Sequence, residues 1–277
     1  MGRAAEPGTF ECSEIIIAGF HRSGTSSVAQ LLHSAGLFLG DELVGEMPYN
    51  PYGHYEDHDV LRIHDQILRE NGLNWQVAEP LVPMIGDWCW QAMQSLIERR
   101  RLEHRLWGFK DPRVCMFMAA WKHLLPSCKF VICFRPVADC SYSLSRRHAL
   151  ELLRASGPRD VHMRFFTDPD LAVRMWLVHN RALLAFAERY EDDVLAVSFD
   201  SLLRGLPLTS LVRSAWGAPL SDVPTFSAVD PLATQRRPSR QPLSDASLIE
   251  ELDQVWGRLL ELESRTMNHP RELVHAS

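Results

Sequence analysis

Lysine is scarce in this 277-residue chain: of 29 basic residues, only Lys110, Lys122 and Lys129 are lysine. This arginine bias is typical of a GC-rich bacterial genome. The formal net charge of -6 and the pI near 6.1 exclude a generic nucleic-acid binder, because such a protein carries a basic surface overall. Any anion-binding site in this chain must therefore be local.

Membrane and redox signals are also missing. No apolar stretch approaches the length of a membrane span, and the amino-terminal residues lack the apolar core of a secretory signal. The six cysteines form no CxxC pair, so we expect reduced, buried thiols and no metal site. The sequence predicts a cytoplasmic protein and carries no sign of its oligomeric state.

Strand and helix patterns alternate along the chain. Short apolar runs such as EIIIA, CKFVICF and DVLAVSF predict strands, and each is followed by a segment with helical periodicity. This alternation predicts a single α/β domain with a mostly parallel central sheet flanked by helices. We expect a loose leader at 1–13, the domain at 14–265 and a tail at 266–277. Helices are predicted near 57–71, 87–103, 114–125, 170–190, 199–204, 208–216 and 245–263, with a polar connection at 155–169.

The first strand pattern runs into the sequence GFHRSGTSS, which is nearly a phosphate-binding loop. Gly19 and Gly24 occupy the glycine positions of a Walker A motif and Ser26 its hydroxyl position, but Thr25 stands where the lysine belongs. Backbone N–H groups at the start of the next helix can still hold phosphate oxygens. Arg22 supplies a cation three positions before the missing lysine. The alternative is an ordinary glycine turn between strand and helix.

Two further cations stand at predicted strand ends. Arg135 follows CKFVICF, with Ser143 two helical turns later, and Lys110 ends the short strand in RLWGFKDPR. In a doubly wound sheet, ligands bind outside the carboxyl ends of the strands, where these side chains should meet those of the loop. An arginine that caps the sheet and a serine that bonds its own helix are the alternative for the second pair.

With these three motifs, the chain resembles the sulfotransferases that use 3'-phosphoadenosine 5'-phosphosulfate (PAPS). GFHRSGTS resembles their phosphosulfate-binding loop, and RPVADCSYS resembles their 3'-phosphate motif. GFKDPR, NPYGHYED and VSFDSLL are similar to the bacterial branch, and KDP is also similar to tyrosylprotein sulfotransferases. These blocks span about residues 14–240. The resemblance implies a P-loop NTPase-like fold of the sulfotransferase type.

The resemblance also implies roles for the cations and hydroxyls. Arg22 and the loop would hold the 5'-phosphosulfate, Lys110 would stabilise the transferring group, and Arg135 with Ser143 would bind the 3'-phosphate. The loop residues concerned are Ser23, Gly24, Thr25, Ser26 and Ser27. The family's later Arg-Lys-Gly block is absent, so Arg236 and Arg237 either serve the 3'-phosphate in its place or are solvated surface arginines. No metal is expected.

The reaction implied is transfer of a sulfuryl group from PAPS to a hydroxyl, less often an amine, with release of 3'-phosphoadenosine 5'-phosphate. A hydroxyl acceptor needs a base near the sulfur. Glu56 is the first candidate, and His54 and Glu42 are its rivals. The acceptor would be a small molecule, a carbohydrate or a natural product, and we expect segments 41–105 and 148–192 to wall its pocket.

Two other functions fit part of the pattern. A P-loop kinase or nucleotide hydrolase needs a loop lysine and a carboxylate that helps to hold Mg²⁺, but this loop lacks the lysine and CKFVICF ends in Arg135. A non-catalytic nucleotide-binding protein of the same fold is the second alternative. The presence of Lys110 and of several potential bases disfavours it.

Overall fold

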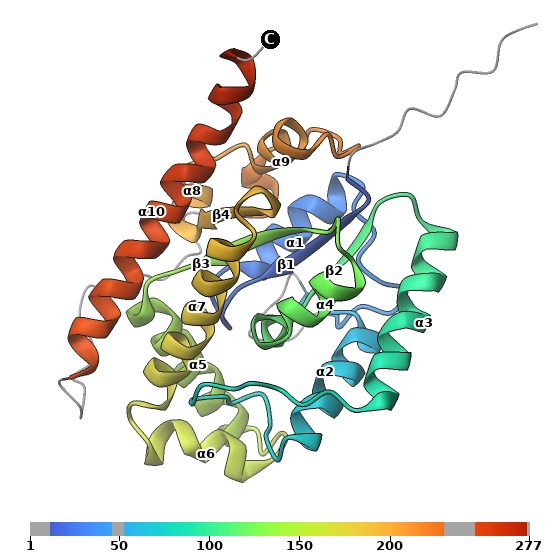
Figure 1. The fold of residues 1–277 in the computed structure, drawn as a ribbon. Helices are drawn as coiled ribbons and strands as arrows, with labels where there is room; N and C mark the ends of the chain where they lie inside the picture. Colours follow the sequence, from blue (N-terminus) through green and yellow to red (C-terminus); the bar gives the residue numbers. More distant parts are fainter. Residues whose placement is uncertain (1–11, 46–52, 230–246, 276–277) are drawn as a thin grey trace, which may run out of the picture.

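The computed structural model describes residues 12–45, 53–229 and 247–275, with side chains described up to residue 268. At its centre is one four-stranded sheet in which every neighbouring pair is parallel. The strands are β1 (Glu14–Ala18), β2 (Trp107–Lys110), β3 (Lys129–Phe134) and β4 (Val194–Ser198), in the spatial order β2-β1-β3-β4 (Figure 1). The prediction of a single α/β domain around a mostly parallel sheet is confirmed.

Helices cover both faces of this sheet (Figure 1). They are α1 (Thr25–Ser34), α2 (His58–Glu70), α3 (Asp87–Glu103), α4 (Met118–Leu124), α5 (Val137–Leu153), α6 (Arg159–Thr167), α7 (Leu171–Arg189), α8 (Phe199–Leu203), α9 (Leu208–Trp216) and α10 (Leu248–His275). Short 3-10 turns occur at η1 (Pro112–Met116), η2 (Glu191–Asp193) and η3 (Thr225–Ser227). No helix in these described ranges is long and apolar enough to cross a membrane.

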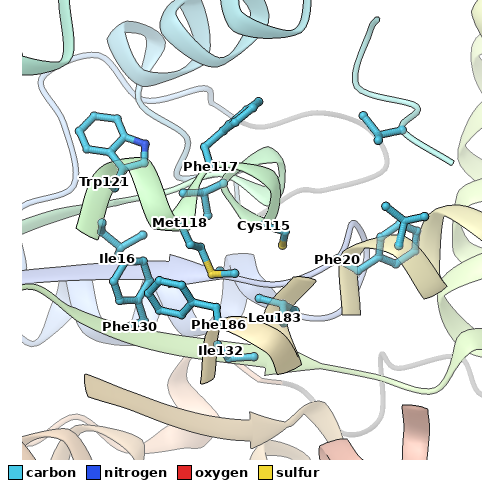
Figure 2. Packing of buried hydrophobic residues seen from close by; sticks show 14 of the residues in the cluster. Ile16, Phe20, Cys115, Phe117, Met118, Trp121, Phe130, Ile132, Leu183 and Phe186 are labelled. Atoms are coloured by element: carbon cyan, nitrogen blue, oxygen red, sulfur yellow. The ribbon is translucent and has the colours of Figure 1, made fainter. Parts of the chain in front are cut away.

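The strands divide the apolar side chains between two cores. Successive side chains of a strand point to opposite faces of the sheet, so Ile15 and Ile17 join one cluster and Ile16 joins the other. The first cluster packs against α1, α8 and α9. The second packs against α2, α3, α4, α7 and α10, and Figure 2 shows part of it, with Trp121 and Phe130 among its large side chains. Burial on both faces explains why the strands are continuously apolar.

The order of the strands sets the position of the functional residues. β1 lies between β2 and β3, with Ile17 paired to Lys110 and Ala18 paired to Ile132. The carboxyl ends of these three parallel strands therefore lie side by side. The loop after β1, the last residue of β2 and the turn after β3 all reach the same edge of the sheet, where open α/β sheets bind ligands.

Three helix predictions need correction. The helix predicted over 114–125 is divided into the η1 turn and α4. The polar stretch 155–169 contains a helix, α6, which packs against α5. The closing helix predicted to end near 263 continues to His275, and Thr266 at the start of the predicted tail is buried. This helix, α10, packs against the edge strand β4 (Figure 1).

Candidate active site

A cavity of about 160 Å³ lies at the carboxyl ends of β1, β2 and β3. It brings together most of the predicted site residues, including cations from three separate segments of the chain. Its lining consists of His21, Arg22, Gly24, Thr25, Ser26, Ser27, His54, Glu56, Lys110, Pro112, Arg135, Arg147 and Phe199. The expected wall segment 41–105 contributes His54 and Glu56, whereas the segment 148–192 contributes no residue to this lining.

The loop after β1 has positive φ angles at three residues, Gly19, Arg22 and Gly24. Gly24 has a φ of 100° and is the N-cap of α1, and an added Cβ would lie 2.2 Å from the ring of Phe199. Since glycine has no side chain to cap the helix, α1 begins without a side-chain cap, and its first residues, Thr25, Ser26 and Ser27, line the cavity. Arg22 has a φ of 65°, an uncommon backbone conformation for a residue with a side chain.

This conformation directs Arg22 across the cavity. Its Nε donates a hydrogen bond of 2.8 Å to the Oγ of Ser143, on the second turn of α5. The structure thus joins the loop to the helix that follows β3. Arg22, from the predicted phosphosulfate loop, therefore contacts Ser143, from the predicted 3'-phosphate motif, although 121 residues separate them in the sequence.

Ser23 departs from the predicted pattern. Its side chain is buried, its Oγ has no hydrogen-bond partner among the described residues, and it is not part of the cavity lining. Its carbonyl oxygen accepts a hydrogen bond from the thiol of Cys133 at 3.1 Å. A Cβ on Gly19 would approach both Cys133 and Ser23, so this serine side chain fills the inside of the loop.

Lys110 is 1% exposed and lines the cavity. Its Nζ donates to the Oε1 of Glu56 at 2.6 Å and to the Oγ of Ser26 at 3.4 Å. A buried ammonium group requires such partners, because an unpaired charge in a low-dielectric site is costly. Lys110 therefore links the loop of β1 to the segment that holds the candidate base.

The candidate bases differ in their surroundings. His54 Nδ1 lies 3.9 Å from Glu56 Oε1, and both residues line the cavity. Burial lowers the pKa of His54 to about 4; the charge of Glu56 opposes this effect, and the positive charges of Lys110, Arg147 and Arg22 add to it. His54 is therefore neutral at neutral pH and able to accept a proton. Glu42 is exposed and lies outside the lining.

A buried network holds the turn that follows Lys110. Asp111 accepts a hydrogen bond from the backbone N–H of Arg113 at 3.0 Å and caps η1. Trp121 donates to Nε2 of His64 at 2.8 Å, so the Nδ1–H of His64 donates to Asp111 at 2.6 Å. Burial raises the pKa of Asp111, but the charge of Arg113 and the bond from His64 outweigh it and hold this pKa below its usual range. These residues orient Lys110.

Arg135 is held at the end of β3 by two side chains. Its Nε donates to Oδ2 of Asp139 at 3.2 Å, and its guanidinium carbon lies 4.8 Å from the centre of the Phe199 ring. Its carbonyl oxygen accepts a hydrogen bond from the indole N–H of Trp176 at 3.0 Å. The ion pair and the stacked ring fix the guanidinium plane toward the cavity.

Sequence reasoning missed several lining residues. Two of them, Phe199 and Pro112, reach the cavity because β4 and β2 end beside it. The third, Arg147, lies on α5 one helical turn after Ser143. The spacing of four residues from Ser143 was the available signal for Arg147. Arg236 and Arg237 lie outside the described residues. Within the described part of the chain, no cluster of three or more histidine, cysteine, aspartate or glutamate residues could hold a metal ion.

The chain shares its fold and its sequence pattern with known proteins. No curated protein matches the chain significantly. Among solved structures, sulfotransferase STF1 from Mycobacterium tuberculosis H37Rv is 15% identical with a TM-score of 0.50, over 90% of this chain and 76% of that chain. The sulfotransferase domain of the Synechococcus PCC 7002 olefin synthase is 19% identical with a TM-score of 0.47, over 90% of this chain and 95% of that chain. The model of the sulfotransferase family matches residues 14–209, most of the chain, and this protein therefore belongs to the sulfotransferase family.

Proposed function

We propose that this protein transfers the sulfuryl group of PAPS to a hydroxyl of a small molecule, a carbohydrate or a natural product, and releases 3'-phosphoadenosine 5'-phosphate. The observation that carries the proposal is the convergence of Arg22, Lys110 and Arg135 from three adjacent strand ends on one cavity. Sulfuryl transfer, like phosphoryl transfer, depends mainly on positioning and on charge stabilisation. Cations from three directions suit that requirement.

The loop and its neighbours fit a phosphosulfate group. At Gly24 the backbone approaches Phe199 so closely that no side chain fits, and the adjoining amino end of α1 offers N–H groups to an anion. Arg22 contributes its guanidinium beside these groups. Arg135 and Ser143 then bind the 3'-phosphate, which distinguishes PAPS from ATP.

The chain's residues carry the remaining chemistry. Bound PAPS supplies an activated sulfuryl group. The Lys110 ammonium stabilises the negative charge that develops between the sulfuryl oxygens and the leaving phosphate. The Glu56 carboxylate, 2.6 Å from Lys110 Nζ, accepts the proton of the acceptor hydroxyl. Neutral His54 is the alternative base. We propose no metal ion in this reaction.

Ligand-dependent thermal stabilisation tests the function. We expect 3'-phosphoadenosine 5'-phosphate and PAPS to raise the melting temperature, and adenosine 5'-phosphate to raise it much less, because it lacks the 3'-phosphate. Arg135→Gln should remove this difference. The matched control is Arg146→Gln, which changes an exposed arginine that is outside the lining. Stabilisation by ATP and Mg²⁺ alone would falsify the proposal and favour a kinase or hydrolase; stabilisation by PAPS without transfer to any acceptor would favour a non-catalytic protein.

A further inference from the structure

The loop after β1 contains a tight turn that presents His21 to the cavity. The N–H of Ser23 donates to the carbonyl oxygen of Phe20 at 3.1 Å and closes a turn of four residues. His21 and Arg22 are the two central residues of this turn, and both line the cavity. Arg22, with its φ of 65°, occupies the central position that takes a positive φ in a type II turn. The turn therefore brings an imidazole to the cavity beside a guanidinium.

His21 is a buried polar residue that lacks a partner. It is 9% exposed, and its Nε2 is closed off from water without a hydrogen-bond partner among the described residues. Its ring packs edge-on against the rings of Trp75 and Phe20, with centres 4.8 Å and 5.8 Å away. A buried polar atom left unpaired costs about 1–3 kcal/mol. A ligand in the cavity that His21 lines can supply the missing hydrogen bond.

The imidazole of His21 is uncharged. Burial is the main reason that its pKa lies well below the ordinary value of 6.5; His179 and Arg113 add to this effect, and Asp111 opposes it. A neutral imidazole has one N–H donor and one bare nitrogen that accepts. It therefore suits a hydroxyl group, which also donates and accepts, and it adds no positive charge that would attract an anion.

His21 lies on the side of the loop that faces β2. The charges of Asp111 and Arg113, in the turn after Lys110, act on it. Arg135 ends β3, and β2 and β3 flank β1 on opposite sides. Under the proposed function, Arg135 holds the nucleotide and Lys110 the sulfuryl group. An in-line displacement brings the acceptor to the sulfur from the side opposite the leaving phosphate, which is the side of His21.

The charges of the cavity limit the kind of acceptor. The lining cations Arg22, Lys110, Arg135 and Arg147 outnumber the one lining carboxylate, that of Glu56, by three. PAPS carries about four negative charges, nearly two of them on its 3'-phosphate. A site filled with the donor therefore has no surplus of positive charge, and a second anion in it would be repelled.

We propose that His21 binds the acceptor through a hydrogen bond to a hydroxyl group, and that this acceptor is an uncharged hydroxyl compound, not a carboxylate or a phosphate. This inference rests on the proposed function. An acceptor with a hydroxyl at this position completes the hydrogen bonding of His21. An acceptor without one leaves the buried ring unpaired, so the site discriminates against it.

Transfer of labelled sulfate from PAPS to paired acceptors tests this inference. The panel contains free sugars beside sugar phosphates, and 4-hydroxyphenylacetamide beside 4-hydroxyphenylacetate. We expect the wild type to prefer the uncharged members. His21→Leu keeps the approximate volume of the side chain but not its hydrogen bond, and should lower kcat/KM for these members by about 5-fold to 100-fold, mainly through KM.

Two further variants separate hydrogen bonding from packing. His21→Gln should recover most of the loss, because its uncharged amide also donates and accepts. His58→Leu removes an exposed histidine outside the lining and should match the wild type. If His21→Gln recovers nothing, the role of His21 is structural and the inference is overturned.

Nucleotide titration separates this inference from the proposed function. His21→Leu should bind PAPS and 3'-phosphoadenosine 5'-phosphate as the wild type does, which also shows that the variant is folded. Weaker binding of PAPS alone would assign His21 to the sulfuryl oxygens, and weaker binding of both would assign it to the nucleotide; either result overturns the inference. A preference for the anionic acceptors, no transfer to any uncharged acceptor, or normal kinetics of His21→Leu overturns it as well. If the wild type binds neither nucleotide, the proposed function fails.

Discussion

Lys110 combines deep burial with a charge that the fold must hold in place. Its Nζ contacts Glu56 and Ser26, and the adjoining Asp111 is fixed by its bond to His64. An ammonium held by packed neighbours is already oriented before substrates bind. Such preorganisation lets a charged group stabilise a transition state without rearrangement at the moment of reaction.

Lys110→Ala should lower turnover by about 100-fold to 1,000-fold, as the loss of a preorganised electrostatic group does. Its affinity for 3'-phosphoadenosine 5'-phosphate should change little, because the nucleotide contacts that we propose are made by the loop, Arg135 and Ser143. Steady-state kinetics with PAPS and nucleotide titration measure the two effects. Lys129→Ala, which removes a lysine that binds Asp193 outside the cavity, is the control. Turnover of Lys110→Ala within about a factor of two of the wild type contradicts the assigned role.

Glu56→Gln should lower turnover by about 100-fold to 10,000-fold, the usual contribution of a general base. The amide keeps the size of the side chain but cannot accept the proton of the acceptor hydroxyl. Glu42→Gln is the matched control, because Glu42 is exposed and outside the cavity. If Glu56→Gln keeps normal activity, His54→Asn should show the loss in its place, and the base is then His54.

The sequence predicted those parts of the site that follow from strand order. Arg22, Lys110 and Arg135 each stand at the carboxyl end of an apolar run, and parallel strands bring such ends together. Side chains that reach the cavity through tertiary packing were harder to find. Phe199 lies against Gly24 only because β4 ends beside the loop, and Ser23 turns inward because the loop packs on Cys133.

At the scale of elements, tertiary contacts stabilise a helix that the periodicity of the sequence did not predict. The helix α6 is polar over most of its length, so its sequence resembles a loop, yet His162 and Phe165 pack against His148 on α5. His148 and His162 are joined through their Nδ1 atoms at 2.8 Å. Contacts of this kind stabilise a helix whose own pattern is weak.

Tertiary contacts also stabilise the long helix α10, at the edge of the sheet. β4 has no strand partner on its outer side among the described residues, and α10 supplies acceptors for its free N–H groups. Glu263 accepts from the N–H of Ser198 at 2.6 Å, and Thr266 accepts from the N–H of Ala196 at 2.9 Å. These bonds cover an edge that would otherwise be open to pairing with another chain. They also explain why the helix continues beyond residue 263.

Thr266→Val should lower the free energy of unfolding by about 1–3 kcal/mol, because it leaves the buried N–H of Ala196 without an acceptor while preserving the size of the side chain. Urea unfolding followed by circular dichroism measures the change. Thr167→Val, at an exposed position of α6, should stay within about 0.5 kcal/mol of the wild type. Equal effects of the two substitutions would show that the bond to β4 contributes nothing to stability.

At the scale of the whole molecule, an acidic chain encloses a cationic cavity. The net charge of -6 gives the protein no general attraction for anions, so selectivity for an anionic ligand has to arise in the cavity itself. The same interior holds uncharged histidines. Burial lowers the pKa of His179 to about 4, although its hydrogen bond to the Met175 carbonyl opposes this shift. Burial also lowers the pKa of His148 to about 3, and the charges of Arg147 and His162 add to that shift.

These histidines make the fold sensitive to acid. Their pKa values lie below the ordinary value of 6.5, so between pH 6.5 and about 4 the unfolded chain binds protons that the folded chain does not. Stability is therefore complete above pH 6.5 and falls as the pH decreases toward 4. The shift of His179 alone corresponds to a loss of about 3 kcal/mol over this interval.

Melting temperatures measured from pH 7.5 to 4 should show this decline, and His148→Gln should make it shallower by removing one group that takes up a proton on unfolding. His58→Gln changes an exposed histidine and should leave the slope as it is in the wild type. A melting temperature that stays constant down to pH 4 would mean that the buried histidines are protonated in the folded protein. The lowered pKa values of these histidines and of His54 would then be wrong. His54 would no longer be a neutral alternative to Glu56 as the base.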